Sequence, residues 1–194
     1  LYQDLSRFGQ SPKILMVACC DSRLEPFALT QSGPGDLFMV RNVANLVPPY
    51  LSTDQVECHG TVAAIQYAVV HLKVTDVIVL GHSHCGGVAA LMSQAHCQHQ
   101  ADDFIAEWMK IAQPAKQRVM QACPEQMPES EKNELCAHYS IQNSLENCLT
   151  YQWIREPVEA GRLALHGWYL DIEHGRISVL EAGDAAFHCL KEAS

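Results

Sequence analysis

The stretch Val77-Ile-Val-Leu-Gly-His-Ser-His-Cys-Gly-Gly87 decides the fold class of this chain. It begins with four apolar residues, Val77–Leu80, three of them β-branched, which is typical of a strand buried on both faces. The glycine that follows is predicted to end this strand, and residues 88–92 have a helical pattern. The imidazole of His82 and the thiol of Cys85 therefore leave the carboxyl end of a strand just before a helix. In open α/β sheets, ligands bind at this place.

Outside this stretch, strand and helix patterns alternate. Apolar runs bounded by glycine, proline or polar turns predict strands at 13–20, 36–41, 163–171 and 177–181. Helical periodicity predicts helices at 27–31 and 53–72, another at 102–120 with a possible break at Pro114, and one or two over 131–159. We therefore expect an α/β fold with a mostly parallel central sheet, helices on both faces and an antiparallel edge hairpin formed by its last two strands.

The composition is that of a folded globular protein. The 194 residues are 48% hydrophobic and 18% charged, enough for one domain with a sizeable core, so we expect residues 1–194 to form a single domain. A net charge of −9 argues against nucleic acid or an anionic membrane as a partner. Nine cysteines without framework spacing favour a reducing compartment. We expect the cytoplasm, or an organelle if a leader has been removed.

Two predicted strand ends carry metal-ligand side chains. Cys19 and Cys20, followed by Asp21, leave one strand, and His82 with Cys85 leaves the other. Parallel strands bring their carboxyl ends to one edge, so the two groups can converge. One thiol from the first pair, added to His82 and Cys85, makes a Cys₂His set, and three protein ligands with an open fourth position is the catalytic zinc pattern. The residues alone do not choose between Cys19 and Cys20, and a His-x-x-Cys pair is often incidental.

Longer motifs around these residues resemble those of a known family. Cys19-Cys-Asp-Ser-Arg23 is similar to the Cys-x-Asp-Ser-Arg signature of the β-class carbonic anhydrases. Gly81-His-Ser-His-Cys-Gly-Gly87 is similar to their Gly-His-Ser-x-Cys-Gly-Gly signature, and the likeness covers nearly the whole chain. The resemblance implies one Zn²⁺ per chain, held by Cys19, His82 and Cys85. It also implies reversible hydration of carbon dioxide to bicarbonate and a proton by zinc-bound hydroxide.

The same resemblance gives the aspartate and arginine of the first motif catalytic roles. Asp21 is expected to accept a hydrogen bond from the zinc-bound hydroxide, and Arg23 to keep Asp21 ionised and oriented. Zinc with three histidine ligands lowers the pKa of bound water to about 7. Two thiolates supply more negative charge, so we expect a higher water pKa and better activity at alkaline pH. In some members the aspartate can swing onto zinc and close the site.

The residues before the first cysteine ligand bear on the subtype. Family members with an inhibitory bicarbonate site carry a tryptophan where this chain has Met16, whereas plant-like, type I members with an open site carry a glutamine where this chain has Gln10. The resemblance to the open-site members implies a carbon dioxide pocket and a proton shuttle. The pocket residues are Gln10, Phe38, Val43 and Tyr67 with the backbone N–H of Gly86, and the shuttle is His71, four residues after Tyr67 on the same helix face.

The resemblance also implies a homodimer or a multiple of dimers. In the family, Gln10, Phe38 and Tyr67 typically serve the site across the subunit interface. Purely structural roles also remain open for three of these residues. Phe38 and Val43 could belong to the ordinary hydrophobic core, and His71 could donate a hydrogen bond to a carbonyl at the end of its helix. Two other functions also stay open: hydrolysis of carbonyl sulfide or carbon disulfide on the same fold, and a non-catalytic zinc protein in which Asp21 closes the metal.

Overall fold

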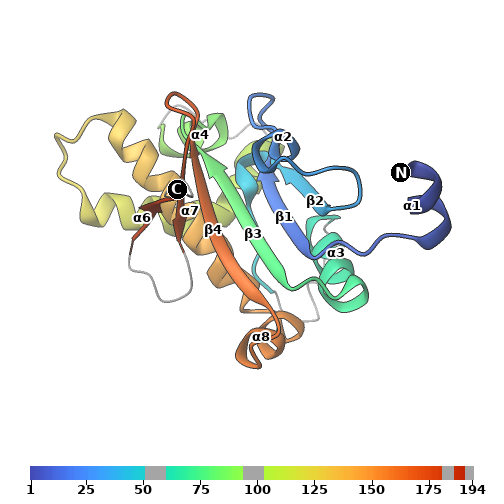
Figure 1. Cartoon of the computed structure of the whole chain (residues 1–194). Coiled ribbons are helices and arrows are strands. Elements are labelled where there is room, and N and C mark those ends of the chain that lie inside the picture. The colour runs from blue at the N-terminus through green and yellow to red at the C-terminus, as the bar shows by residue number, and fades with distance from the viewer. Residues whose placement is uncertain (51–59, 94–102, 181–185, 191–194) are drawn as a thin grey trace.

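A computed structural model describes residues 1–50, 60–93, 103–180 and 186–190 of the chain. Its centre is a sheet with the strand order β2-β1-β3-β4-β5-β6 (Figure 1). The first four strands in that order are parallel: β2 (Leu37–Asn42), β1 (Ile14–Cys19), β3 (Asp76–His82) and β4 (Ala164–Asp171). The last two, β5 (Arg176–Leu180) and β6 (His188–Cys189), are antiparallel to their neighbours. The predicted mostly parallel sheet is therefore confirmed.

Two details of the sheet differ from the prediction. The expectation that Gly81 ends the central strand is wrong, because Gly81 and His82 pair with Tyr169 and Leu170 of β4, so β3 continues through His82. The antiparallel hairpin of β4 and β5 is confirmed, but β6 pairs outside it. A strand of two residues is too short to leave a periodic pattern in the sequence.

Most of the helices follow the predicted segments, but the first helix was not predicted. Before the central strand lie α1 (Tyr2–Phe8), α2 (Pro26–Thr30), the 3₁₀ turn η1 (Val43–Asn45) and α3 (Gly60–Gln66), which continues as the π-helix η3 (Tyr67–Leu72). After it lie α4 (Gly86–Met92), α5 (Phe104–Met109), η5 (Lys110–Ala112), α6 (Gln113–Ala122), α7 (Glu129–Cys148) and α8 (Gln152–Glu159). The start of the predicted helix 53–72 lies outside the described residues.

The break predicted at Pro114 falls elsewhere. The helical segment is interrupted at Lys110–Ala112, and Pro114 stands in the first turn of α6. A proline is tolerated there because the first N–H groups of a helix have no intrahelical acceptor. The proline therefore starts a helix instead of breaking one.

Helices cover both faces of the sheet. The connection from β1 to β2 runs in one direction along the sheet, and those leading to β3 and β4 run in the other. Right-handed crossovers then put α2 on the face opposite to α7, and in Figure 1 α7 passes behind the sheet while α2 lies in front of it. No helix in the described part of the chain is long and apolar enough to cross a membrane.

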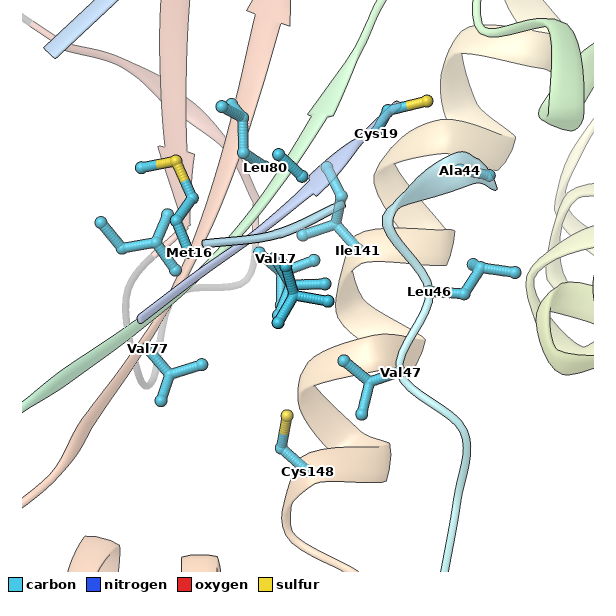
Figure 2. Close-up of a cluster of buried hydrophobic side chains, with 14 of the residues drawn as sticks. Met16, Val17, Cys19, Ala44, Leu46, Val47, Val77, Leu80, Ile141 and Cys148 are labelled. Carbon is cyan, nitrogen blue, oxygen red and sulfur yellow. The ribbon is translucent and has the colours of Figure 1, made fainter. Parts of the chain in front are cut away.

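The layer between the sheet and α7 forms the core that positions the strand ends. Figure 2 shows Val17, Val47, Ile141 and Cys148 gathered there, and all four are buried. Two strand glycines allow α7 to approach, since a Cβ at Gly81 or Gly167 would lie 2.8 or 2.9 Å from Ile141. This close approach explains why glycine is found inside β3, where it reads as a strand terminator in the sequence.

Candidate metal centre and active site

Three buried side chains meet at the carboxyl edge of the sheet. Cys19 is the last residue of β1, His82 is the last of β3, and Cys85 directly precedes α4. One ligand atom from each lies within 4.8 Å of the other two. The residues are 4%, 1% and 6% exposed. They converge because β1 and β3 are adjacent parallel strands in register, with Ala18 opposite Leu80.

The histidine of this group has one nitrogen free for a metal. Nδ1 of His82 lies 2.8 Å from the carbonyl oxygen of Ser83. A carbonyl only accepts, so Nδ1 carries the hydrogen and Nε2 carries the lone pair. Nε2 is buried and has no hydrogen-bond partner among the described residues. An unsatisfied buried acceptor is costly, and coordination by a metal would satisfy it.

The two thiols of the group are coupled. Their Sγ atoms are 4.0 Å apart. The hydrogen bond to Cys85, with burial, raises the pKa of Cys19, and the same hydrogen bond lowers the pKa of Cys85. The thiol of Cys85 therefore loses its proton more readily than that of Cys19, and a divalent cation would stabilise both as thiolates. Thiolate and imidazole are ligand types that zinc prefers, so the residues present fit that metal. Cys20, by contrast, is exposed and lies outside the group.

An aspartate and an arginine flank this group. Nε and Nη2 of Arg23 donate to Oδ1 and Oδ2 of Asp21 over 2.9 and 2.7 Å, and the backbone N–H of Arg23 donates to Oδ1 over 3.0 Å. These hydrogen bonds hold the pKa of Asp21 well below its usual range. Oδ2 of Asp21 lies 3.8 Å from Nε2 of His82. An ionised carboxylate therefore lies beside the metal group without belonging to it.

Two further residues, Arg41 and His84, hold the loop that carries Asp21 and Arg23. The guanidinium of Arg41 donates to the carbonyl oxygens of Cys19, Asp21 and Leu24 over 3.2, 2.9 and 2.7 Å. The carbonyl oxygen of His84 accepts from Nη2 of Arg23 over 3.0 Å, and His84 has a left-handed backbone conformation with φ of 54°. From the sequence, Arg41 had no predicted role in this loop. No local signal showed that it would hold three carbonyl groups, because those contacts cross from β2 to β1.

Two of the expected pocket residues lie near the metal group of their own chain. Val43 follows Asn42, which pairs with Cys19, and its Cγ1 lies 2.9 Å from where a Cβ on Gly87 would stand. The carbonyl oxygen of Val43 accepts a hydrogen bond from Nε1 of Trp108 over 2.8 Å. Gly86, the first residue of α4, directly follows the ligand Cys85. Both residues are therefore placed beside the metal centre.

The other expected residues lie elsewhere in the chain. The rings of Phe38, Tyr67 and His71 contact one another in tilted pairs, with centroids 5.9 Å apart in the first pair and 5.3 Å in the second. Phe38 pairs with Leu15, so it is roughly 13 Å along the sheet from Cys19, at about 3.3 Å per residue. Gln10 is exposed just after α1. A single chain therefore does not bring these residues to its own metal group.

Comparisons with known proteins agree with this geometry. Residues 14–177 match the sequence model of the carbonic anhydrase family. The chain is 39% identical over 183 residues to the carbonic anhydrase of Pseudomonas aeruginosa, which covers 94% of this chain and 80% of that protein. The described fold is similar to the β-carbonic anhydrase CcaA, with 32% identity, a TM-score of 0.88 and coverage of 98% of this chain and 82% of that one.

A second solved structure supports the same assignment. The tetrameric β-carbonic anhydrases of Sordaria macrospora match with 30% identity and a TM-score of 0.74, over 95% of this chain and 86% of theirs. The fold and the comparisons thus define an α/β enzyme whose strand ends bring together a Cys-His-Cys group that could hold a metal ion. The chain belongs to the carbonic anhydrase family, in its β class. Since each of these relatives is a carbonic anhydrase, the comparisons do not support the sulfur-substrate alternative.

Proposed function

We propose that this chain hydrates carbon dioxide reversibly with one Zn²⁺ held by Cys19, His82 and Cys85. The observation that carries the proposal is the group of three buried ligand atoms within 4.8 Å, in which Nε2 of His82 has no other partner among the described residues. Bound Zn²⁺ would supply a Lewis acid that activates water. Because two thiolates donate more negative charge than neutral imidazoles, we expect activity to rise toward alkaline pH.

The dyad beside this group would orient the reactants. Asp21 stays ionised, so its carboxylate can only accept, and it would take a hydrogen bond from the oxygen that attacks carbon dioxide. That bond would direct the remaining lone pair of the oxygen toward the carbon. Arg23 would fix the carboxylate through its two-pronged contact, and the carbonyl of His84 would fix Arg23 in turn.

An open site is favoured over one closed by the aspartate. Both oxygens of Asp21 are engaged by Arg23, and Asp21 does not belong to the group of ligand atoms. Met16 is fully buried in β1 where regulated relatives carry tryptophan. These features support the plant-like, type I subtype and argue against a non-catalytic zinc protein.

A homodimer, or a multiple of dimers, would complete the pocket. Val43 and Gly86 would come from the chain that holds the metal, whereas Gln10, Phe38 and Tyr67 would come from the partner subunit. The exposure of Tyr67, at 46%, supports this assignment. Helix α1 supports it as well, because it buries none of its residues against its own chain. An apolar pocket with one amide donor suits carbon dioxide and bicarbonate.

His71 would carry the proton to bulk solvent. Its ring is exposed and packs against Tyr67, a predicted pocket residue, with centroids 5.3 Å apart. Imidazole titrates near working pH, as a shuttle requires. We also propose a reducing compartment, the cytoplasm or an organelle, because the described cysteines are all free.

The decisive experiment compares two neighbouring cysteines. Zinc per chain would be quantified, and carbon dioxide hydration followed by stopped flow from about pH 6.5 to about pH 9. We expect one zinc per chain and a rate that rises steadily with pH in the wild type. The Cys19→Ser variant should lose both zinc and activity, while Cys20→Ser, its matched control, should keep both.

Two outcomes would contradict this proposal. Zinc without hydration at any pH would exclude the proposed reaction. A sharp, cooperative loss of activity below about pH 8 would show that Asp21 closes the site, as in the regulated relatives.

A further inference from the structure

The turn that carries Val43, a predicted pocket residue, has an uncommon backbone. Val43 is the first residue of η1, and the two residues after it have left-handed conformations, Ala44 with φ of 61° and Asn45 with φ of 50°. Residues other than glycine keep such conformations only where their surroundings hold them. Ala44 and Asn45 are 1% and 4% exposed, so the turn is part of the packed interior. The contacts of this turn therefore decide where the side chain of Val43 lies.

Polar side chains hold the end of the turn that leads away from the metal group. Nδ2 of Asn42 donates to the carbonyl oxygen of Leu46 over 2.9 Å, and Oδ1 of Asn42 accepts from the N–H of Leu46 over 2.8 Å. Oγ of Ser144, on α7, accepts from the N–H of Val47 over 3.2 Å. Figure 2 shows Leu46 and Val47 on the stretch of chain that runs beside α7. These contacts fix the residues after Val43 but do not reach Val43 itself.

Trp108, on α5, makes the contact that reaches Val43. Its indole Nε1 donates to the carbonyl oxygen of Val43 over 2.8 Å, which is the length of a well-formed hydrogen bond. The next residue, Met109, is buried, and its Sδ lies 3.4 Å from where a Cβ on Gly87 would stand. Cγ1 of Val43 lies 2.9 Å from the same point. Helix α5, the turn η1 and the start of α4 therefore meet around Gly87, two residues after Cys85.

The helix that carries Trp108 is itself anchored at both ends. At its start, Oδ1 of Asp103 accepts from the N–H of Ala106 over 2.9 Å. Just after its end, Nδ2 of Asn143, a buried side chain of α7, donates to the carbonyl oxygen of Ile111 over 2.9 Å. Because the donor stands on a fixed helix, the hydrogen bond from Trp108 fixes the position of its acceptor as well.

We propose that Trp108 is a positioning residue for the carbon dioxide pocket, which it serves by holding Val43 through this hydrogen bond. The inference rests on the proposed function, because it takes Val43 as part of the pocket wall. Without the indole N–H, the turn would be free to move and the wall would hold carbon dioxide less tightly. An apolar wall contacts the substrate equally before and during the reaction, so its loss should raise KM and leave kcat unchanged.

The first test is the effect of Trp108→Phe on KM and kcat for hydration. Phenylalanine keeps an aromatic ring but lacks the N–H. We expect kcat/KM to fall by about fivefold, while kcat and zinc per chain stay within about twofold of the wild type. Trp153→Phe is the matched control, since Trp153 is also half-buried but belongs to α8. That helix lies at the end of β4 opposite to α4 (Figure 1), so this variant should keep the kinetics of the wild type.

A double-mutant cycle tests whether Trp108 acts through Val43. Val43→Ala removes most of the side chain that the hydrogen bond positions, and it should raise KM by itself. In the Val43→Ala background, Trp108→Phe should therefore lower kcat/KM by less than about twofold. A general structural role of Trp108 would instead lower kcat/KM by the same factor in both backgrounds.

Amide hydrogen exchange gives a readout that does not depend on activity. In zinc-loaded Trp108→Phe, the N–H groups of Leu46 and Val47 should exchange at least about fivefold faster than in the wild type, because the turn would open more often. The same two N–H groups in Trp153→Phe should exchange within about twofold of the wild-type rate.

Three results would each overturn the inference: unchanged exchange at Leu46 and Val47 in Trp108→Phe, equal losses of kcat/KM in the two backgrounds, or loss of zinc from Trp108→Phe. The last result would mean that the metal ligands depend on the same contact. A wild-type protein that binds zinc but does not hydrate carbon dioxide would contradict the proposed function instead. The exchange measurement would still decide whether Trp108 holds the turn.

Discussion

Arg23 engages both carboxylate oxygens of Asp21, with Nε 2.9 Å from Oδ1 and Nη2 2.7 Å from Oδ2. The contact keeps the carboxylate ionised and turns it toward Nε2 of His82, 3.8 Å away. It also occupies the oxygen that lies nearest the metal group. In the proposed function, Asp21 would therefore serve as a hydrogen-bond acceptor in catalysis, and its contact with Arg23 would oppose the use of Asp21 as a fourth metal ligand.

Replacing Arg23 by lysine should damage catalysis while leaving the metal in place. Lysine keeps the charge but cannot reproduce the two-pronged contact. We expect kcat for hydration to fall by about 10²-fold, the size of effect seen when one positioned hydrogen-bonding group is lost. The pKa of Asp21 should rise in Arg23→Lys, because the lysine ammonium makes fewer hydrogen bonds to the carboxylate than the guanidinium does. Arg118→Lys, which alters an ion pair with Glu146 away from the site, is the control. Unchanged kcat in Arg23→Lys would exclude this role.

We expect Arg41 to be a positioning residue for the loop from Cys19 to Leu24. Its three bonds to the carbonyls of Cys19, Asp21 and Leu24 fix the backbone on both sides of the dyad. We expect Arg41→Gln to lower the free energy of unfolding by about 2 kcal/mol. Zinc affinity should fall by about tenfold. Urea denaturation and competition with a chelator would measure the two effects, and Arg176→Gln, on the exposed edge of β5, serves as control. Zinc affinity equal to that of the control would contradict the role.

The parts of the fold that the sequence predicted are those governed by local pattern. The strands β1 and β3 are recognisable because residues such as Val17 and Val79 are buried within continuous apolar runs. The candidate metal ligands are recognisable because His82, Cys85 and one of Cys19 and Cys20 stand at the ends of these runs, where a parallel sheet brings them together. Strand position alone did not choose Cys19 over Cys20, and that choice came from the resemblance to the family.

Features that depend on tertiary contacts could not be predicted. Gly81 reads as a strand terminator, and only the packing of Ile141 against it explains a glycine inside β3. The π-helix at Tyr67–Leu72 is only six residues long, and over so short a segment its apolar spacing cannot be told from that of an α-helix. The pattern therefore predicted an α-helix there. The unpartnered hydroxyl of Tyr169 depends on how α7 and the β4–β5 turn close around it, which no local pattern records.

Burial of His138 should make the protein sensitive to acid. Its ring packs against Tyr169 and Phe187, with centroids 4.2 and 4.6 Å away, and burial lowers its pKa to about 4. The unfolded chain, with a histidine pKa of about 6.5, binds this proton more readily than the folded chain. Stability is therefore lost as the pH falls from about 6.5 to about 4, by up to about 3 kcal/mol. Well above about pH 6.5, His138 is neutral in both the folded and the unfolded state and no longer affects stability.

Denaturation midpoints measured across that pH range would test this sensitivity. His138→Phe keeps an aromatic ring in the cluster and removes the titrating group, so its stability should fall less than that of the wild type below about pH 6. His174→Gln changes a histidine that is exposed at the β4–β5 turn and should follow the wild type. If His138→Phe loses stability in parallel with the wild type, another group is responsible for the acid sensitivity.

Complementation between two inactive chains would decide whether the pocket crosses the dimer interface. Phe38 and Tyr67 pack together, yet Phe38 is placed four residues along the sheet from the ligand Cys19. Tyr67→Ala should therefore impair the metal site of the partner and leave its own intact, while His82→Ala should abolish its own metal site and still supply Tyr67. In a heterodimer of these two variants, carrying different tags and purified by both, one site of the two has every residue it needs. We expect about half of the wild-type activity per dimer. If Tyr67 serves its own chain, neither site is complete and the heterodimer will be as impaired as the two homodimers.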